Sequence, residues 1–270
     1  MIWKCREHEL DLSSTTRVMG IVNVTPDSFS DGGLYYKPAE AIARARNCVN
    51  EGADIIDLGG ESTRPDATPL NWQREWLRLE PVLHILVREF ANTPISVDTY
   101  HPETAERALA EGASIINCVY AEPIPAMALL ARRTGCGLII PCRSAAELAA
   151  LNLPSALTGG ERTQVLIDPE IGFATTREED LALLGSLRTL AQLAPVCVGV
   201  SRKRFVKKLT GERVAGKNLG GSVGAAVWCV MNGASVVRVH DVKETRQAID
   251  VARLLATTFP AENPVSFTKA

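Results

Sequence analysis

The sequence predicts an α/β protein that folds as a single (β/α)8 TIM barrel with an N-terminal hairpin. Three observations predict this fold: short apolar runs alternate with helical patterns, a weak repeat recurs along the chain, and each apolar run ends in a polar side chain. The 270 residues, of which 46% are hydrophobic and 22% charged, are enough to bury the core of one large domain.

The hydrophobic pattern predicts the individual strands and helices. Helix-forming segments separate eight short apolar runs, and they begin with residues 38–52 and the Trp-rich stretch 71–90. Residues 144–152 predict a short helix with a capping box from Ser144 to Glu147. The predicted strands are residues 17–24, 54–60, 94–99, 114–119, 137–142, 164–169, 195–201 and 235–241.

A degenerate repeat favours one barrel over two domains. The segments EGADIIDLG, EGASIINCV and NGASVVRVH share a helix stop, a glycine and a strand. Their glycines, Gly52, Gly112 and Gly233, are 60 and 121 residues apart, which corresponds to two and four βα units of about 30 residues. We expect a positive φ at each glycine, at the C-terminal end of a helix, because glycine adopts that conformation at little cost.

The same pattern sets the domain boundaries. Residues 17–258 form the predicted barrel. Residues 1–16 precede the first strand and alternate loosely, so we expect a hairpin that closes the bottom of the barrel. We expect residues 259–270 to form a flexible tail.

The composition excludes several classes of protein. With a net charge of −2 and no basic cluster longer than SRKR, the chain lacks the basic stripe of a nucleic-acid-binding surface. No apolar run reaches the roughly 18 residues of a membrane span, and the charged N-terminus does not resemble a signal peptide, so we expect a cytoplasmic protein without membrane contact. The seven cysteines are scattered without a C-x-x-C pair, which favours free thiols over disulfides or zinc.

Polar side chains end the predicted strands. A barrel gathers all of these ends on one face, where barrel enzymes place their chemistry. One polar end alone means little, because every strand must leave the core, and Asp98 can instead cap the following helix. Many such ends on one rim predict an active site. They are Asn23, Asp57 with Glu61, Asp98, Asn117, Cys142, Asp168, Ser201 with Lys203, and Arg238 with His240.

The loop after the first strand, VNVTPDSFSDGG, is polar and specific in its order. It resembles the first signature of the dihydropteroate synthase family. Further blocks follow in the order of that family: GADIIDLGGESTRP, SVDTYHPETA, SIIN, DPEIGF, GVSRK and RVHDVKET. The resemblance covers residues 18–255, which is nearly the whole chain.

The resemblance implies an enzyme of folate biosynthesis. It would condense 6-hydroxymethyl-7,8-dihydropterin pyrophosphate with 4-aminobenzoate, releasing pyrophosphate and giving dihydropteroate, with Mg²⁺ as cofactor. It also implies a homodimer and a target of sulfonamides. The residue types suit this chemistry, because the donor-rich edge of a pterin needs buried acceptors, which Asp98, Asp168 and Asn117 supply, and Lys203 can donate to the ring carbonyl or N5.

The leaving group and the second substrate need further residues. Carboxylates near the ring stabilise the cationic pterin that forms as pyrophosphate departs. Arg238 and His240, two residues apart and therefore on one side of a strand, are expected to act as cations that clamp the pyrophosphate. Asn23 is expected to bind Mg²⁺, with pyrophosphate oxygens completing the shell. The resemblance implies that the remaining substrate-binding residues are Thr25, Asp27, Phe29, Thr63, Arg64, Pro65, Phe173 and Ser201.

The chain also departs from the family pattern on the fourth to sixth strands. We expect Glu170, which stands where the family has glycine, to adopt a positive φ and to point its carboxylate to solvent. We place Cys142 at the pocket edge. The departing positions are Cys118, Pro141, Cys142, Glu170, Ala174 and Thr175.

These departures leave two alternatives to a synthase. One is a divergent paralogue that binds a pterin without condensing it, and the other is a pterin-dependent methyltransferase. The signature loop at the first strand counts against the paralogue. The presence of Lys203, Arg238 and His240 counts against the methyltransferase, because methyl transfer needs no pyrophosphate clamp.

Overall fold

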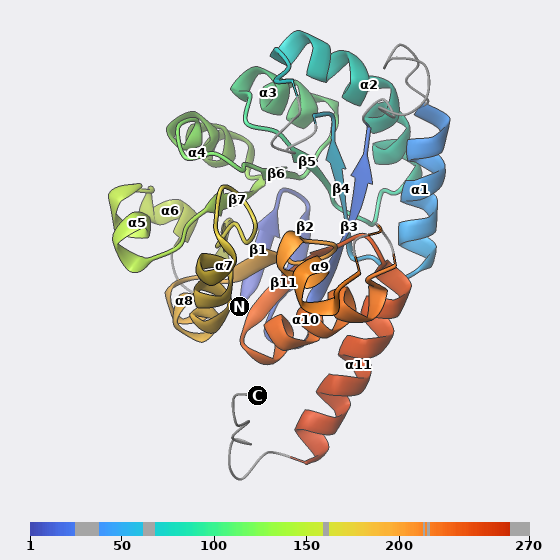
Figure 1. Cartoon of the computed structure of the whole chain (residues 1–270). Coiled ribbons are helices and arrows are strands. Elements are labelled where there is room, and N and C mark those ends of the chain that lie inside the picture. The colour runs from blue at the N-terminus through green and yellow to red at the C-terminus, as the bar shows by residue number, and fades with distance from the viewer. Residues whose placement is uncertain (25–37, 62–67, 159–161, 213, 215–216, 260–270) are drawn as a thin grey trace.

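The structure is a computed structural model that describes residues 1–24, 38–61, 68–158, 162–212, 214 and 217–259. Within these residues, eight parallel strands close into a barrel, and helices ring the strands (Figure 1). This confirms the predicted (β/α)8 barrel. The barrel strands are β3 (Arg17–Asn23), β4 (Ile55–Gly59), β5 (Ile95–Asp98), β6 (Ile115–Asn117), β7 (Gly137–Pro141), β9 (Val165–Asp168), β10 (Val196–Gly199) and β11 (Ala234–Val239).

The helices follow the strands along the chain. The predicted stretch 71–90 becomes α2, whose N-cap Asn71 accepts a hydrogen bond from Arg74 N at 2.9 Å. None of the described helices is long and apolar enough to cross a membrane. The helices are α1 (Pro38–Asn50), α2 (Trp72–Glu89), α3 (Pro102–Glu111), α4 (Ile124–Thr134), α5 (Ala145–Ala150), α6 (Ser155–Thr158), α7 (Arg177–Gly185), α8 (Leu187–Leu193), α9 (Arg204–Thr210), α10 (Leu219–Met231) and α11 (Val242–Thr258).

The repeated glycines lie between a helix and the next strand. Gly52, Gly112 and Gly233 have φ angles of 93°, 119° and 99°, as the repeat predicts. A side chain is strained in this left-handed region, so glycine is the residue that lets the chain turn from the helix into the strand.

The barrel strands bury side chains on both faces. Residues such as Val18, Ile56, Val97 and Ile116 belong to the large cluster that packs strands against helices. The alternate residues form a second, smaller cluster inside the barrel. It contains Trp3, Cys5, Met19, Ile55, Ile115, Ile139, Leu166, Cys197 and Val236.

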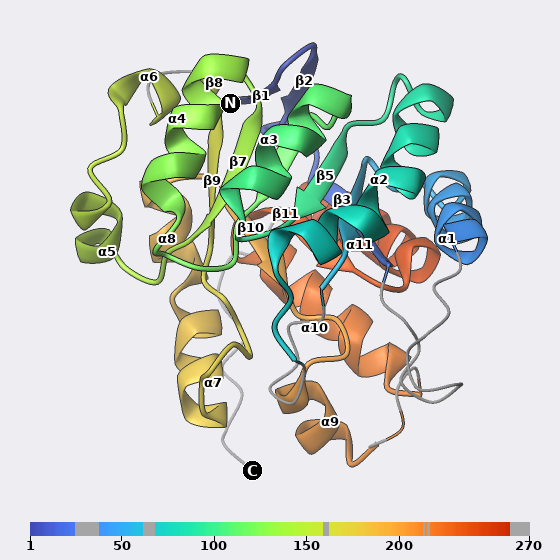
Figure 2. The same ribbon diagram turned by 90° about the horizontal axis from the view of Figure 1, so that it is seen from above.

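The N-terminal hairpin closes the amino-terminal end of the barrel. Its strands, β1 (Ile2–Cys5) and β2 (His8–Asp11), pair antiparallel, and β1 also pairs in parallel with β8 (Arg162–Thr163). The buried Trp3 donates from Nε1 to the carbonyl of Gln164 at 2.9 Å. Figure 2 shows the hairpin at one end of the barrel and α9 at the other.

Gly137, at the start of β7, lets the hairpin approach the barrel. A Cβ atom there would lie 2.6 Å from Cys5 Sγ and 3.0 Å from the Trp3 ring. Only glycine leaves enough space for this contact. Residues 260–270 of the predicted tail lie outside the described residues.

Candidate active site

The inner face of the barrel changes from apolar to charged toward the carboxyl ends of the strands. Side chains alternate along a strand, so a residue two positions beyond the inner apolar cluster faces the same way. Two positions beyond Ile55, Ile115, Leu166 and Val236 stand the following polar residues: Asp57, Asn117, Asp168 and Arg238. The strands therefore place a charged layer above an apolar one, and three of the six predicted catalytic residues belong to that layer.

Arg238 lies at the centre of the charged layer. Its Nε donates to Asp57 Oδ2 at 2.5 Å, and its Nη2 donates to Asp98 Oδ2 at 2.7 Å. Asn117 Nδ2 donates to the same oxygen of Asp57 at 3.3 Å. Burial opposes the charge of Arg238, but Asp57 and Asp98 raise its pKa above the usual value, so it stays a cation. One guanidinium group therefore joins strands β4, β5 and β11.

The two carboxylates predicted to bind the pterin have raised pKa values. Burial raises the pKa of Asp98 to about 7, although Arg238 opposes the shift. Burial also raises the pKa of Asp168, against hydrogen bonding from Glu170 N and the charge of Lys203. A ligand that donates hydrogen bonds to these oxygens would favour their charged forms, so the site is suited to a donor-rich ring.

Lys203, Phe173 and Gly172 form one wall beside Asp168. Lys203 precedes α9, and its Nζ lies 3.8 Å from the centroid of the Phe173 ring, which is a cation–π contact. A Cβ on Gly172 would lie 3.0 Å from Lys203 Cδ, and Gly172 has a φ of 79°. Burial lowers the pKa of Lys203 to about 8, while Asp168 opposes the shift. The lysine is therefore mostly charged at neutral pH.

His240 follows β11 and lies beside Ser201, with 3.1 Å between Nδ1 and Oγ. Burial, with the charges of Arg202 and Arg238, lowers the pKa of His240 to about 3. The imidazole is therefore neutral at pH 7, which corrects the expectation that His240 is a cation. It can still donate one hydrogen bond to an anion, and the fixed positive charge beside it comes from the arginines.

Asn23 ends β3 with an exposed side chain. A Cβ on Gly59 would lie 3.8 Å from Asn23 Oδ1 and 3.9 Å from Asp98 Oδ2, so both side chains lie close to this glycine. The amide oxygen is the kind of ligand that Mg²⁺ accepts. Among the described residues, no three His, Cys, Asp or Glu side chains gather as a metal site. Asn23 alone therefore fits Mg²⁺ only where substrate oxygens and water complete the shell.

Two of the eight predicted substrate-binding residues belong to the described chain. Phe173 contacts Lys203, and Ser201 contacts His240. The other six lie outside the described residues, and their predicted roles stay predictions. They are Thr25, Asp27, Phe29, Thr63, Arg64 and Pro65.

Glu170 differs from the expectation in one respect. Its φ of 56° matches a position that suits glycine. The expectation that its carboxylate points to solvent is wrong: the side chain is 18% exposed, and Oε2 lies 3.0 Å from Arg143 Nη2. A cation from the loop after β7, Arg143, therefore holds the Glu170 carboxylate in the structure.

The other departures are largely buried in the walls around the site. The Cys142 thiol is fully buried and donates to Ser144 O at 3.3 Å, and burial raises its pKa, so it is not an accessible group at the pocket edge. Cys118 Sγ donates to Tyr120 O at 3.2 Å, and Thr175 Oγ1 donates to Asp180 Oδ1 at 2.5 Å. Pro141 ends β7, and Ala174 has a φ of 51°. All seven cysteines are free and buried, which confirms the expected thiols.

Sequence reasoning missed two residues of the site. Asp57 is one of the polar strand ends without a predicted role, yet it is fully buried and binds both Arg238 and Asn117. The position of Asp57 two residues after Ile55, which faces the inside of the barrel, could have indicated that Asp57 faces the site. Arg143, which holds Glu170 and donates to Phe173 O at 3.1 Å, had no signal in spacing or motif.

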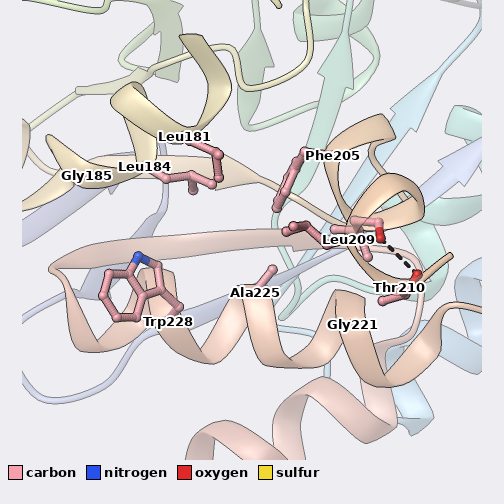
Figure 3. Close-up of a pocket in the computed structure, with 10 residues that line it drawn as sticks. Leu181, Leu184, Gly185, Phe205, Leu209, Thr210, Gly221, Ala225 and Trp228 are labelled. Carbon is pink, nitrogen blue, oxygen red and sulfur yellow. Dashed lines mark hydrogen bonds between the residues drawn. The ribbon is translucent and has the colours of Figure 1, made fainter. Parts of the chain in front are cut away.

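An apolar groove lies away from this charged layer, on the outer surface. It encloses about 350 Å³ between α7, α9 and α10, and Figure 3 shows Trp228, Leu209 and Leu181 around it. Its lining lacks ionisable side chains, so it has none of the groups that the predicted chemistry needs.

Comparisons with known proteins agree with the geometry. Residues 19–147 and 144–240 match the family described as pterin binding enzyme. The dihydropteroate synthase of Neisseria meningitidis serogroup B is 38% identical, over 93% of this chain and 96% of its own. Two solved dihydropteroate synthases are similarly close. That of Xanthomonas albilineans with 4-aminobenzoic acid is 34% identical over 94% of this chain and 98% of its own, with a TM-score of 0.82. That of Thermus thermophilus with 6HMPPP is 34% identical over 94% of this chain and 100% of its own, with a TM-score of 0.79. The chain belongs to the dihydropteroate synthase family of pterin-binding enzymes.

Proposed function

We propose that the chain condenses 6-hydroxymethyl-7,8-dihydropterin pyrophosphate with 4-aminobenzoate. The aromatic amine nitrogen bonds to the pterin methylene carbon, the bond from that carbon to the pyrophosphate oxygen breaks, and the amine loses a proton. The observation that carries the proposal is the charged layer at the carboxyl end of the barrel, where Arg238 also binds Asp98 and Asp168 lies near Lys203. The related structures that contain 4-aminobenzoic acid and 6HMPPP support it.

The pterin ring is proposed to bind edge-on to this layer. Asp168 accepts from the ring donors, and Asn117 can both donate and accept because its amide has both functions. Lys203 donates to a ring acceptor while Phe173 covers its ammonium group. The ring gains positive charge as the carbon–oxygen bond breaks, and carboxylates already fixed by Arg238 stabilise that charge without reorganising.

The pyrophosphate is proposed to leave toward the ends of β3 and β11. His240 donates a hydrogen bond there, and Arg202, which is bonded to Asp241 at 2.6 Å, adds positive charge beside it. We propose that Asn23 holds Mg²⁺ together with pyrophosphate oxygens, and that the ion neutralises charge on the leaving group. The proposed roles of Thr25, Asp27, Thr63 and Arg64 follow from the resemblance.

One assay separates this function from the two alternatives. The purified chain is incubated with the pterin pyrophosphate, 4-aminobenzoate and Mg²⁺, and both pyrophosphate and dihydropteroate are measured. We expect equal amounts of the two products and inhibition by a sulfonamide. Pterin binding in a calorimetric titration, without product in this assay, would show a binding paralogue. Transfer of a methyl group to a corrinoid protein in a separate incubation with methyltetrahydrofolate would show a methyltransferase.

We also propose a cytoplasmic homodimer. Support comes from large apolar side chains that stay exposed on α9 to α11, because a soluble monomer rarely leaves a large contiguous patch uncovered. Trp228, beside the groove of Figure 3, is 54% exposed. Sedimentation velocity tests the dimer. We expect a mass of two chains, and a single-chain mass at micromolar concentration would contradict the proposal. The other exposed apolar residues there are Leu209, Met231, Val251, Leu254 and Leu255.

A further inference from the structure

Arg143 and Glu170 link the loops that follow two neighbouring barrel strands. Arg143 comes two residues after β7 ends, and Glu170 two residues after β9 ends. Arg143 Nη2 lies 3.0 Å from Glu170 Oε2 and donates to the carbonyl of Phe173 at 3.1 Å. Both side chains are largely covered, with exposed fractions of 34% and 18%. One guanidinium group therefore holds both ends of the turn from Glu170 to Phe173.

This turn connects two groups of the proposed pterin site. Glu170 N donates to Asp168 Oδ1 at 2.7 Å, and Phe173 N donates to Glu170 O at 3.0 Å. Phe173 in turn covers the ammonium group of Lys203. A displacement of the turn would therefore change the orientation of the Asp168 carboxylate and the surroundings of Lys203 together.

The turn does not hold its conformation by sequence preference alone. Glu170 and Ala174 have φ angles of 56° and 51°, a region that side chains disfavour. Glu170 also places a carboxylate close to Asp168, and burial raises the pKa of Glu170 to about 7 although Arg143 opposes the shift. The turn therefore needs a contact that holds its backbone and a cation that balances the Glu170 carboxylate. Arg143 provides the first at Phe173 O and the second at Glu170 Oε2.

The backbone of Arg143 is itself held in place by the following helix, α5. Its backbone N donates to Glu147 Oε2 at 2.6 Å, and Ser144 caps α5 by accepting from Glu147 N at 3.2 Å. The predicted capping box therefore forms with Arg143 N in place of Ser144 N as the second donor. The short helix after β7 thus fixes the backbone from which the guanidinium group reaches the turn.

We propose that Arg143 is a positioning residue for the synthase reaction, and that Arg143 and Glu170 act as a matched pair that fixes the turn carrying Asp168 and Phe173 against the pterin. The proposal rests on the function proposed above. Arg143 acts through other residues: it does not contact the reacting atoms, and its effect is on how well the pterin is held.

The first experiment measures steady-state kinetics of Arg143→Met and of the double variant Arg143→Met/Glu170→Gly. For Arg143→Met we expect KM for the pterin pyrophosphate to rise about tenfold with kcat changed less than about threefold, because binding is lost more than chemistry. The double variant should return to within about threefold of the natural protein, because glycine adopts the positive φ and removes the unpaired carboxylate. If Arg143 merely stabilised the fold, its loss would lower the folded fraction and with it the apparent kcat, and KM would not change.

The control is Arg162→Met. Arg162 forms an exposed ion pair with Glu9 at 2.7 Å near the N-terminal hairpin, and we expect unchanged kinetics. If Arg143→Met does not fold, Arg143→Lys keeps the charge with fewer donors, and an intermediate rise in KM is the expected result. Calorimetric titration with 6-hydroxymethylpterin gives a second readout that needs no turnover, and we expect the same order of affinities among the variants.

The outcomes are distinguishable. If the natural protein binds the pterin but makes no dihydropteroate, the proposed function fails, while the calorimetry still tests the pair. If the natural protein is active and both Arg143 variants that fold match it in KM and in pterin affinity, the proposal is overturned. It is also overturned if the double variant is no better than Arg143→Met.

Discussion

Replacing Arg238 by methionine should destabilise the protein and weaken pterin binding as well as pyrophosphate binding. The guanidinium group is bonded to Asp57 at 2.5 Å and to Asp98 at 2.7 Å, and Asp57 is fully buried. Removing one partner of a buried ion pair costs about 3–5 kcal/mol because a buried charge is left uncompensated. This is a large part of the roughly 5–15 kcal/mol by which a typical domain is stable.

Stability is measured by urea unfolding, followed by tryptophan fluorescence. The affinities of the folded protein for 6-hydroxymethylpterin and for the pyrophosphate-bearing substrate are measured by calorimetric titration. For a slope near 3 kcal/mol per molar urea, the expected loss lowers the midpoint by roughly 1–1.7 M. Adding Asp57→Asn to Arg238→Met should restore about half of the loss, because one unpaired carboxylate is removed. Arg46→Met is the control: its pair with Glu89 is also short, at 2.7 Å, but is exposed, so water screens it and the unfolding midpoint should stay unchanged.

One result would refute this reasoning. If Arg238→Met loses less than about 1 kcal/mol and binds 6-hydroxymethylpterin normally, while its affinity for the pyrophosphate-bearing substrate falls at least tenfold, then Arg238 serves only the leaving group. Asp57 and Asp98 would then not need Arg238 to compensate their negative charge. Equal losses for both ligands would instead contradict the original assignment of Arg238 to a pyrophosphate clamp.

Three further predictions concern a carboxylate of the site, a buried acid and a close contact. Asp168→Asn should lower kcat/KM by about 30- to 1,000-fold, or about 2–4 kcal/mol, in the assay of pyrophosphate and dihydropteroate, because a charged acceptor for the pterin is lost. A loss below threefold would exclude Asp168 from the site. Burial raises the pKa of Glu75 to about 7, so the folded state binds more protons than the unfolded chain between about pH 4.5 and 7, and this group's contribution to stability falls as pH rises through that window. Glu75→Gln should therefore remove about 2 kcal/mol of the pH dependence measured by urea unfolding at pH 5.5 and 8.5, and an unchanged pH dependence would contradict the shift. Gly137→Ala should cost about 1–3 kcal/mol in the same measurement, because its Cβ would overlap Cys5 and Trp3, whereas a neutral effect would show that the hairpin yields easily.

The sequence was sufficient to predict the barrel and much of its charged layer. Strand alternation and the motif order were enough to select Asp98, Asn117, Asp168 and Arg238, because these properties are local to each strand. The pairing of Arg143 with Glu170 was not predictable in this way, since two loops 27 residues apart meet only after β7 and β9 have paired. For the same reason, periodicity alone could not predict the positive φ of Ala174.

Charge states and accessibility were the least predictable properties. His240 is neutral because it is buried and lies near the charge of Arg202. Arg202 has a φ of 59° and donates to Asp241. The burial of Cys142 depends on how the short helix α5 packs after β7. The charge state and the exposure of a side chain depend on several neighbours that are distant in the sequence. The order of residues along the chain does not show which neighbours these are.

The N-terminal hairpin has a consequence for synthesis of the chain. Trp3 is made 161 residues before Gln164, whose carbonyl its indole binds. At about 5–20 residues per second, the ribosome needs roughly 8–32 s to produce that partner. During this time the apolar face of β1 has no barrel end to cover. Until then, β1 is an aggregation-prone and chaperone-accessible segment of the growing chain, and the step that seals the barrel waits for a segment made more than half the barrel later.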